Sequence, residues 1–270
     1  MGISMAERLF VVDAFTDRPF AGNPAAVCVL GNEREDSWLA AVAGEMNLAE
    51  TAFLRGGRDR WNLRWSTPTV EVDLCGHATL ASAHALWEQG LADPGHPLAF
   101  ATKSGVLGAV RRGPEIELDF PAEPASPAPP PRGLLQALRV PSARFAGRNR
   151  LDYLVELESE EAIRSLDPDL PLLAAATRPA RGVIVTAVSD SPDRDFVSRY
   201  FAPSAGIDED PVTGSAHCCL GPFWGERLGK RQLRGYQASA RGGTVGVRLE
   251  GGGRVALIGR AVTIWRGEIL

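Results

Sequence analysis

The chain has 270 residues, of which 44% are hydrophobic and 23% charged, and its formal net charge is −4. This composition is typical of a globular protein, either one large domain or two of ordinary size. Both charge signs are spread along the chain, and no apolar run approaches the roughly 20 residues that span a bilayer, so we expect neither a nucleic-acid partner nor a membrane. Its four cysteines form no disulfide framework, which favours a cytoplasmic location.

The first quarter of the chain predicts strands and one helix. Apolar residues alternate in several short stretches, and Asp36 can cap a helix. The expected strands cover residues 8–15, 25–30 and 61–66, and the expected helix covers residues 37–46.

Residues 47–54 also alternate, and Glu50 shares a face with Leu48, Ala52 and Leu54. A carboxylate on an apolar face is costly to keep charged, and burial raises its pKa toward the range useful for proton transfer. If the true pattern is shifted by one residue, Glu50 is instead a solvated surface charge. The residues alone leave both interpretations open.

Residues 71–83 predict an extended segment, a sharp turn at Gly76 and the start of a helix over 78–89. The first N–H groups of a helix have no partner within it, and the helix dipole adds to their attraction for an anion. Cys75 and His77 flank the turn, which therefore offers an anion site beside a thiol and an imidazole. A strand-to-helix corner with a buried Cys and a hydrogen-bonded His fits the same pattern.

A proline-rich segment over residues 121–133 predicts a stiff connector, so we expect two domains, 1–125 and 126–270. Before it, residues 100–110 and 116–120 resemble the two arms of a hairpin. After it, the expected elements are a strand at 153–157, helices at 160–173 and 216–228, an apolar run at 182–188, and a closing meander over 245–249, 255–258 and 261–265.

Two parts of the chain match when the numbering is shifted. The shift puts Cys75–Ala78 on Thr213–Ala216 and residues 103–108 on residues 241–246. Asp210 is one of three acids just before the second copy. A repeat this long predicts two similar halves, each with a turn, a helix and a β-hairpin.

The sequence indicates no cofactor and no metal. Lys103 and Lys230 are the only lysines, and neither lies where a buried amine could hold pyridoxal phosphate. No dinucleotide-binding motif is present. His77 and His84 are seven residues apart on one expected helix, hence ~10 Å, too far to share a metal. Cys75 and His77 show no zinc spacing with any other residue.

Five segments carry a family resemblance: VDAFTDRPFAGNPAAV, MNLAETAF, STPTVEVDLCGHATLASA, FAPSAGIDEDPVTGSAH and a close of the form ARGGTVGV…GRAVTIWRG. Together they resemble the PhzF-like phenazine biosynthesis family of the diaminopimelate epimerase-like superfamily. The resemblance implies an α+β fold with two pseudo-symmetric domains, each a curved, mostly antiparallel sheet around a central helix, with the site between them. It also implies cofactor-independent isomerisation of a small carboxylate substrate by proton transfer, and a homodimer.

The resemblance also implies roles for individual residues. Glu50 matches the general acid/base, and His77 and Asp210 match residues that assist proton movement. The helix starts that hold the substrate carboxylate are matched by Gly76, Gly214 and Ser215.

Cys75 departs from the best-known phenazine enzymes, which have Ala at this position. Epimerase relatives carry a cysteine at each helix start, but here the second position is Thr213, which disfavours a symmetric two-thiol racemisation. A helix start lowers the pKa of a thiol, so Cys75 is either an acidified base working opposite Glu50 or an inert packed residue. A protein that only binds a small acid or a protein partner is a further alternative.

Overall fold

The computed structural model describes residues 6–58 and 60–269. The chain divides into two compact units, the first made of Met1–Asp119 with Ile258–Leu270 and the second of Phe120–Leu257. The expected division at residue 125 put the last strand with the second half, whereas here it lies with the first unit. Among the described residues, no helix is long and apolar enough to cross a membrane.

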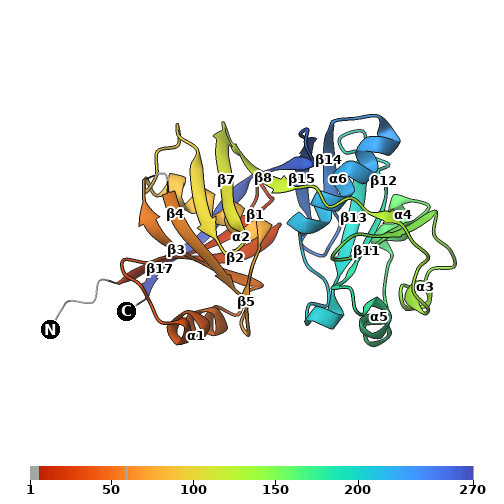
Figure 1. Ribbon diagram of the computed structural model, residues 1–270, viewed down its shortest axis with the longest axis horizontal. Helices are drawn as coiled ribbons and strands as arrows, with labels where there is room; N and C mark the ends of the chain where they lie inside the picture. The colour runs from red at the N-terminus through yellow and green to blue at the C-terminus, as the bar shows by residue number, and fades with distance from the viewer. Residues whose placement is uncertain (1–5, 59, 270) are drawn as a thin grey trace. The chain divides into compact units, whose positions relative to one another are not determined.

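In the first unit the elements are β1 (Glu7–Ala14), β2 (Asn23–Val29), α1 (Asp36–Met46), β3 (Glu50–Gly57), β4 (Arg60–Ser66), β5 (Glu71–Val72), α2 (Gly76–Glu88), β6 (Leu98–Thr102), β7 (Gly105–Arg112), β8 (Glu115–Pro121) and β17 (Ala261–Ile269) (Figure 1). The core of the sheet follows the order β17, β1, β2, β3, β4. All of these neighbours are antiparallel except β2 and β3, which run parallel.

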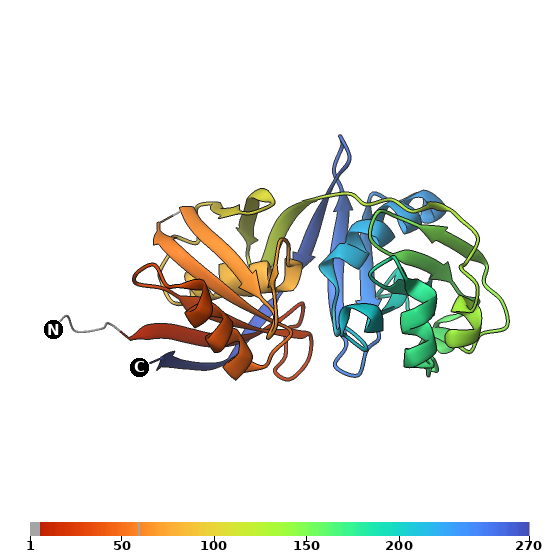
Figure 2. The same ribbon diagram turned by 60° about the horizontal axis from the view of Figure 1, so that its bottom comes forward.

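Helices α1 and α2 cover different faces of this sheet (Figures 1 and 2). Leu39 and Ala43 of α1 pack on Leu9, Ala26 and Phe53. Helix α2 packs against β1, β2, β3 and β17 and is buried on nearly all sides. Its residues are small or apolar on nearly every side, which is typical of a helix enclosed by the rest of the fold.

The second unit contains β9 (Ser126–Pro127), α3 (Leu134–Ala137), β10 (Phe145–Arg148), β11 (Tyr153–Glu156), α4 (Glu160–Arg164), α5 (Leu170–Thr177), β12 (Val183–Val188), β13 (Phe196–Phe201), a 3₁₀ turn (Pro203–Ala205), α6 (Gly214–Leu228), β14 (Gln232–Gln237), β15 (Gly243–Leu249) and β16 (Arg254–Gly259). Strands β10 to β15 pair in chain order, with β11–β12 and β13–β14 parallel and the other pairs antiparallel.

Helix α6 packs closely on β14 and β15. A Cβ atom on Gly221 would lie 2.5 Å from Val247 Cγ1, and one on Gly225 would lie 2.5 Å from Leu249 Cδ1. Only glycine therefore lets the helix approach these strands so closely. Trp224 stacks on Phe196 on the same helix face.

The predicted α+β class is confirmed, and the pseudo-symmetry of the two units stays a prediction. Two element predictions were wrong. Residues 100–110 are not one arm of a hairpin, because a turn at residues 103–104 separates β6 from β7. The helix expected over 160–173 is broken into α4 and α5, since Pro168 cannot continue a helix and Asp169 caps the next one by accepting from Leu172 N.

Candidate functional site

Three predicted residues come together in the first unit. Glu50 is the first residue of β3, Cys75 precedes α2, and His77 is the second residue of α2. Glu50 Oε2 lies 3.1 Å from His77 Nε2, and only 13% of the Glu50 side chain is exposed. Cys75 Sγ lies 3.6 Å from His77 Nδ1. Glu50 is therefore a largely enclosed carboxylate in contact with an imidazole, and not a solvated surface charge.

Asn23, which the sequence reasoning missed, orients this imidazole. It is fully buried at the start of β2, and its Nδ2 lies 3.2 Å from His77 Nδ1. When the ring is neutral and Asn23 donates to Nδ1, the single ring proton lies on Nε2 and is donated to Glu50. Asn23 is thus the third member of a chain that runs from an amide through an imidazole to a carboxylate.

The turn before Asn23 is held by a side chain that binds the backbone and by a glycine. The buried Asp13 carboxylate accepts from Phe20 N at 2.8 Å, and Phe20 has a φ of +65°. Gly22 has a φ of +66°, and a Cβ there would lie 2.1 Å from Ala14 O, so only glycine fits. A Gly-Asn-Pro sequence between two predicted strands was the available signal for a fixed turn.

The pKa values of His77 and Cys75 each reflect burial and the groups beside them. Burial by itself lowers the pKa of His77, but Cys75 and Glu50 beside the ring raise it well above its ordinary value. At Cys75, burial raises the pKa of the thiol most and the Glu50 carboxylate raises it further, and together they outweigh the lowering effect of His77. This direction is opposite to the acidification expected from the helix start, so Cys75 is held as a protonated thiol.

In the second unit, Asp210 and Thr213 are joined at the start of α6. Thr213 Oγ1 donates to the carboxylate of Asp210, which is 8% exposed. The fully buried Gln237 holds both residues, because its Nε2 donates to Asp210 O at 2.6 Å and its Oε1 accepts from Thr213 N at 2.9 Å. Gln237 lies in β14, which was not predicted, so no sequence signal pointed to it.

Ser215 is held by an ion pair between the part-exposed Arg181 and the buried Asp152. Arg181 Nη2 donates to Ser215 Oγ and to Asp152 Oδ2, each at 2.8 Å. Tyr200 donates its hydroxyl to the other oxygen of Asp152, whose carboxylate is fully buried. Since Ser215 Oγ accepts from Arg181, its own O–H remains a donor. Arg181 was not singled out in the sequence.

The predicted residues thus form two groups, each within its own unit. Glu50, Cys75, Gly76 and His77 lie together in the first. The second contains Asp210, Thr213, Gly214 and Ser215. Cys75 and Thr213 are the extended residues that directly precede α2 and α6, as the shifted numbering predicted.

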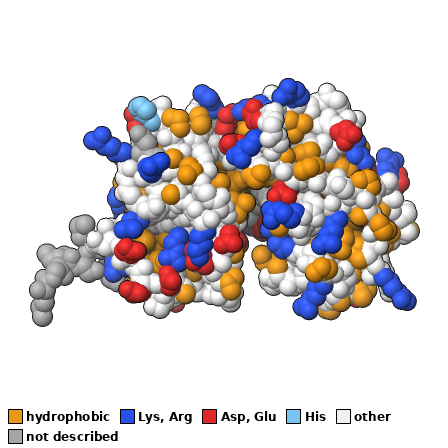
Figure 3. All heavy atoms as spheres, viewed as in Figure 1, with side chains coloured by type: hydrophobic (Ala, Val, Ile, Leu, Met, Phe, Trp, Pro, Cys, Tyr) orange, Lys and Arg blue, Asp and Glu red, His pale blue; other side chains and the backbone are white. Residues whose placement is uncertain are grey.

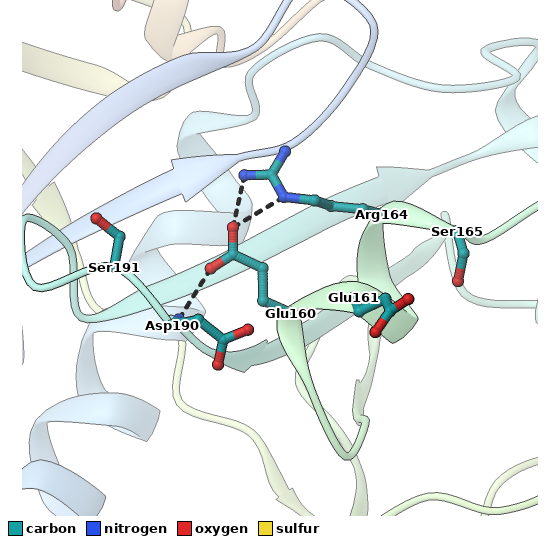
Figure 4. Close-up of a pocket in the computed structure, with 6 residues that line it drawn as sticks. All are labelled: Glu160, Glu161, Arg164, Ser165, Asp190 and Ser191. Carbon is teal, nitrogen blue, oxygen red and sulfur yellow. Dashed lines mark hydrogen bonds and ion pairs between the residues drawn. The ribbon is translucent and has the colours of Figure 1, made fainter.

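A hollow of about 620 Å³ in the second unit contains none of these residues (Figure 4). Glu160 lies at its centre, where its carboxylate accepts from Arg164 Nε at 2.8 Å and from Asp190 N at 3.0 Å. Ser189 Oγ also donates to Glu160. The carboxylate is fully engaged in tying α4 to the loop after β12, which is a structural role.

The charged side chains on the face shown in Figure 3 are of both signs and interspersed. By contrast, Glu50, Cys75 and His77 form a concentrated set whose ligand atoms all lie within 4.8 Å of one another. Sequence spacing could not reveal it, because Glu50 belongs to a strand and the other two residues belong to the start of a helix.

The family model described as "Phenazine biosynthesis-like protein" matches residues 12–267. A protein of Halalkalibacterium halodurans, named an uncharacterized isomerase, is 52% identical over 267 residues, which cover 98% of this chain and 99% of that protein. The crystal structure of a PhzF-family phenazine biosynthesis protein from Enterococcus faecalis has a TM-score of 0.93 at 39% identity, covering 98% of this chain and 100% of that one.

More distant structures extend the likeness of the fold alone. A hydroxyproline epimerase from Agrobacterium vitis has a TM-score of 0.62 at 12% identity, covering 100% of this chain and 94% of that one. The matched segments of the sequence and the extent of these matches agree. The chain belongs to the phenazine biosynthesis-like (PhzF) family.

Proposed function

We propose that the protein is a cofactor-independent isomerase that moves a proton between two atoms of a small carboxylate substrate, with Glu50 as the general acid/base. Relatives named as isomerases support an isomerase-type enzyme. Structural neighbours named as a racemase and an epimerase support it as well. The contact of Glu50 with His77 is the observation that carries the finer proposal. A homodimer is part of the proposal and derives from the resemblance.

The geometry supports proton transfer because the carboxylate and the imidazole are in direct hydrogen-bond contact in an enclosed site. His77 can donate a hydrogen bond to Glu50 while Glu50 is charged. It can accept a hydrogen bond from Glu50 when Glu50 is protonated. Asn23 keeps the ring in the orientation that this exchange needs. A carboxylate that takes and returns a proton on a bound acid requires no cofactor for that step.

The start of α2 supplies a second element of the proposed mechanism. Its first N–H groups lie beside Cys75 and His77 and attract an anion. They therefore stabilise either the substrate carboxylate or the enolate-like charge that develops when an adjacent carbon loses its proton. The resemblance also predicts that the same substrate contacts the start of α6, beside Asp210 and Ser215, and this stays a prediction.

A second candidate is an epimerase or racemase in which Cys75 works opposite Glu50. The position of Cys75 Sγ, 3.6 Å from His77 Nδ1, favours it, because the thiol lies beside the imidazole. The raised pKa of the buried thiol opposes it. A protein that only binds small acids or protein partners is the third candidate, and an acid/base pair enclosed from solvent has no evident use in it.

The test is hydrogen exchange in D₂O against a panel of small cyclic and amino carboxylic acids, followed by NMR. We expect loss of a proton signal at a carbon near the carboxylate of at least one acid. This exchange should fall about 10²- to 10⁴-fold in Glu50→Gln, the range of general acid–base catalysis. The matched control is Glu45→Gln, which removes an exposed carboxylate of α1. Exchange that survives in Glu50→Gln and disappears in Cys75→Ala would select the second candidate.

A further inference from the structure

The cluster in the first unit offers three kinds of metal ligand, whose atoms all lie within 4.8 Å of one another. His77 Nε2 lies 3.1 Å from Glu50 Oε2 and 4.0 Å from Cys75 Sγ. In a tetrahedral zinc site, with Zn–N and Zn–O of about 2.1 Å and Zn–S of about 2.3 Å, neighbouring ligand atoms lie about 3.4 to 3.6 Å apart. Each of the two observed distances is within a few tenths of an ångström of that spacing.

We propose that Glu50, Cys75 and His77 form a binding site for Zn²⁺, and that bound zinc inhibits the enzyme by occupying its acid/base pair. Three protein ligands leave a fourth position for a water molecule. Zinc binding stands on the geometry alone, whereas inhibition rests on the proposed function. Zinc would act here as a reversible inhibitor and would take no part in the reaction.

The donor set selects zinc over the common hard cations. A thiolate, an imidazole and a carboxylate suit zinc, whereas Mg²⁺ and Ca²⁺ prefer oxygen ligands throughout. The charges also balance, because one thiolate and one carboxylate neutralise Zn²⁺. A neutral assembly suits a site in which Cys75 and His77 are only 6% and 4% exposed.

Binding is balanced by the release of protons to solvent. The Cys75 thiol gives up its proton as the Zn–S bond forms, a protonated His77 ring gives up the proton on Nε2, and the carboxylate binds without further change. When Nε2 binds the metal, Nδ1 must carry the ring proton and needs an acceptor. The Asn23 amide is 3.2 Å away and supplies its oxygen once it is turned over, which is the outer hydrogen bond that ligating histidines commonly make.

The test uses the full chain with Co²⁺ as a spectroscopic probe and Zn²⁺ as its competitor, without any substrate. We expect one equivalent of Co²⁺ to give a thiolate-to-cobalt charge-transfer band, and Zn²⁺ to displace it. Cys75→Ala, and Cys75→Ser as a second variant of closer shape, should lose the band and bind zinc at least about 100-fold more weakly. Asn23→Ala should weaken zinc binding about 10- to 100-fold.

Cys28→Ala is the matched control, because it removes another buried thiol of the first unit that lies outside the cluster. It should keep both the band and the affinity. Absence of saturable binding in the wild type, or a band that survives in both Cys75 variants, would overturn the site. If zinc binds but leaves the exchange reaction unchanged, inhibition is refuted. If zinc binds and Glu50→Gln retains full exchange, the proposed function fails and the metal site stands.

Discussion

Acidification should weaken the second unit through His217, a fully buried residue of α6. Its Nδ1 donates to Thr213 O at 2.8 Å, and among the described residues its Nε2 has no hydrogen-bond partner. The Phe196 ring lies 5.9 Å from the imidazole between centroids, and a Cβ on Gly235 would lie 3.2 Å from Nε2. Adding a proton at Nε2 therefore creates a buried charge whose new N–H has no acceptor among the described residues. For this reason burial lowers the pKa of His217 to about 4.

The size and sign of the effect follow from this pKa. In the unfolded chain His217 takes up a proton near its ordinary pKa of 6.5, whereas in the folded chain it does so only near 4. Between these values the unfolded state binds the extra proton, so stability falls as the pH falls. A difference of about 2.5 units, at 1.36 kcal/mol each, is about 3 kcal/mol lost between pH 6.5 and pH 4. Above pH 6.5 His217 adds no pH dependence.

Urea unfolding of the wild type and of His217→Phe, measured from pH 4 to pH 8, checks this prediction. Phe keeps an aromatic ring beside Phe196 and cannot titrate. The stability of the wild type relative to the variant should therefore fall by about 3 kcal/mol on going from pH 7 to pH 4. NMR titration of the ring in the folded wild type gives an independent value. Parallel stability curves, or a ring that titrates near 6.5, would refute the reasoning.

Three further predictions concern the two groups of site residues. Asn23→Ala frees the His77 ring, so exchange should fall about 10- to 100-fold, as when an orienting partner is lost; unchanged exchange in the NMR assay would remove Asn23 from the mechanism. Arg181→Met leaves the buried Asp152 carboxylate unpaired, and because Arg181 is itself part-exposed we expect a loss of about 2 kcal/mol in urea unfolding. A loss within experimental error would contradict this. Cys75 should react slowly with iodoacetamide at pH 7 and faster as the pH rises, because its pKa is raised; rapid modification at neutral pH, located by mass spectrometry, would contradict it.

The sequence predicted those parts of the site that depend on local pattern. Alternation offered the inner face of the strand as one of two open positions for Glu50, and the shifted repeat located both helix starts at Gly76 and Gly214. Strand alternation repeats every two residues, and each helix start follows from a glycine turn. Both can therefore be recognised from residues that are neighbours in the sequence.

The partners of these residues could not be predicted in the same way. Asn23 meets His77 across 54 positions, and Arg181 meets Ser215 across 34. Such contacts depend on which strands lie beside each helix start. Strands β10 and β14 were missed because their sequences, FAGR and QLRGYQ, interrupt a weak apolar pattern with glycine. The two alternatives for Cys75 could not be decided from the sequence, because the helix start was the only influence on its pKa visible there, and burial and Glu50 outweigh it.

The central claim is that Glu50 and His77 move the proton as one unit. A double-variant cycle of Glu50→Gln, His77→Asn and their combination, measured on the exchange rate of whichever acid the wild type turns over, tests it directly. Residues that act as a unit are strongly non-additive, so the double variant should lose little more than Glu50→Gln alone. Losses that multiply would show that the two residues act independently and would contradict the account.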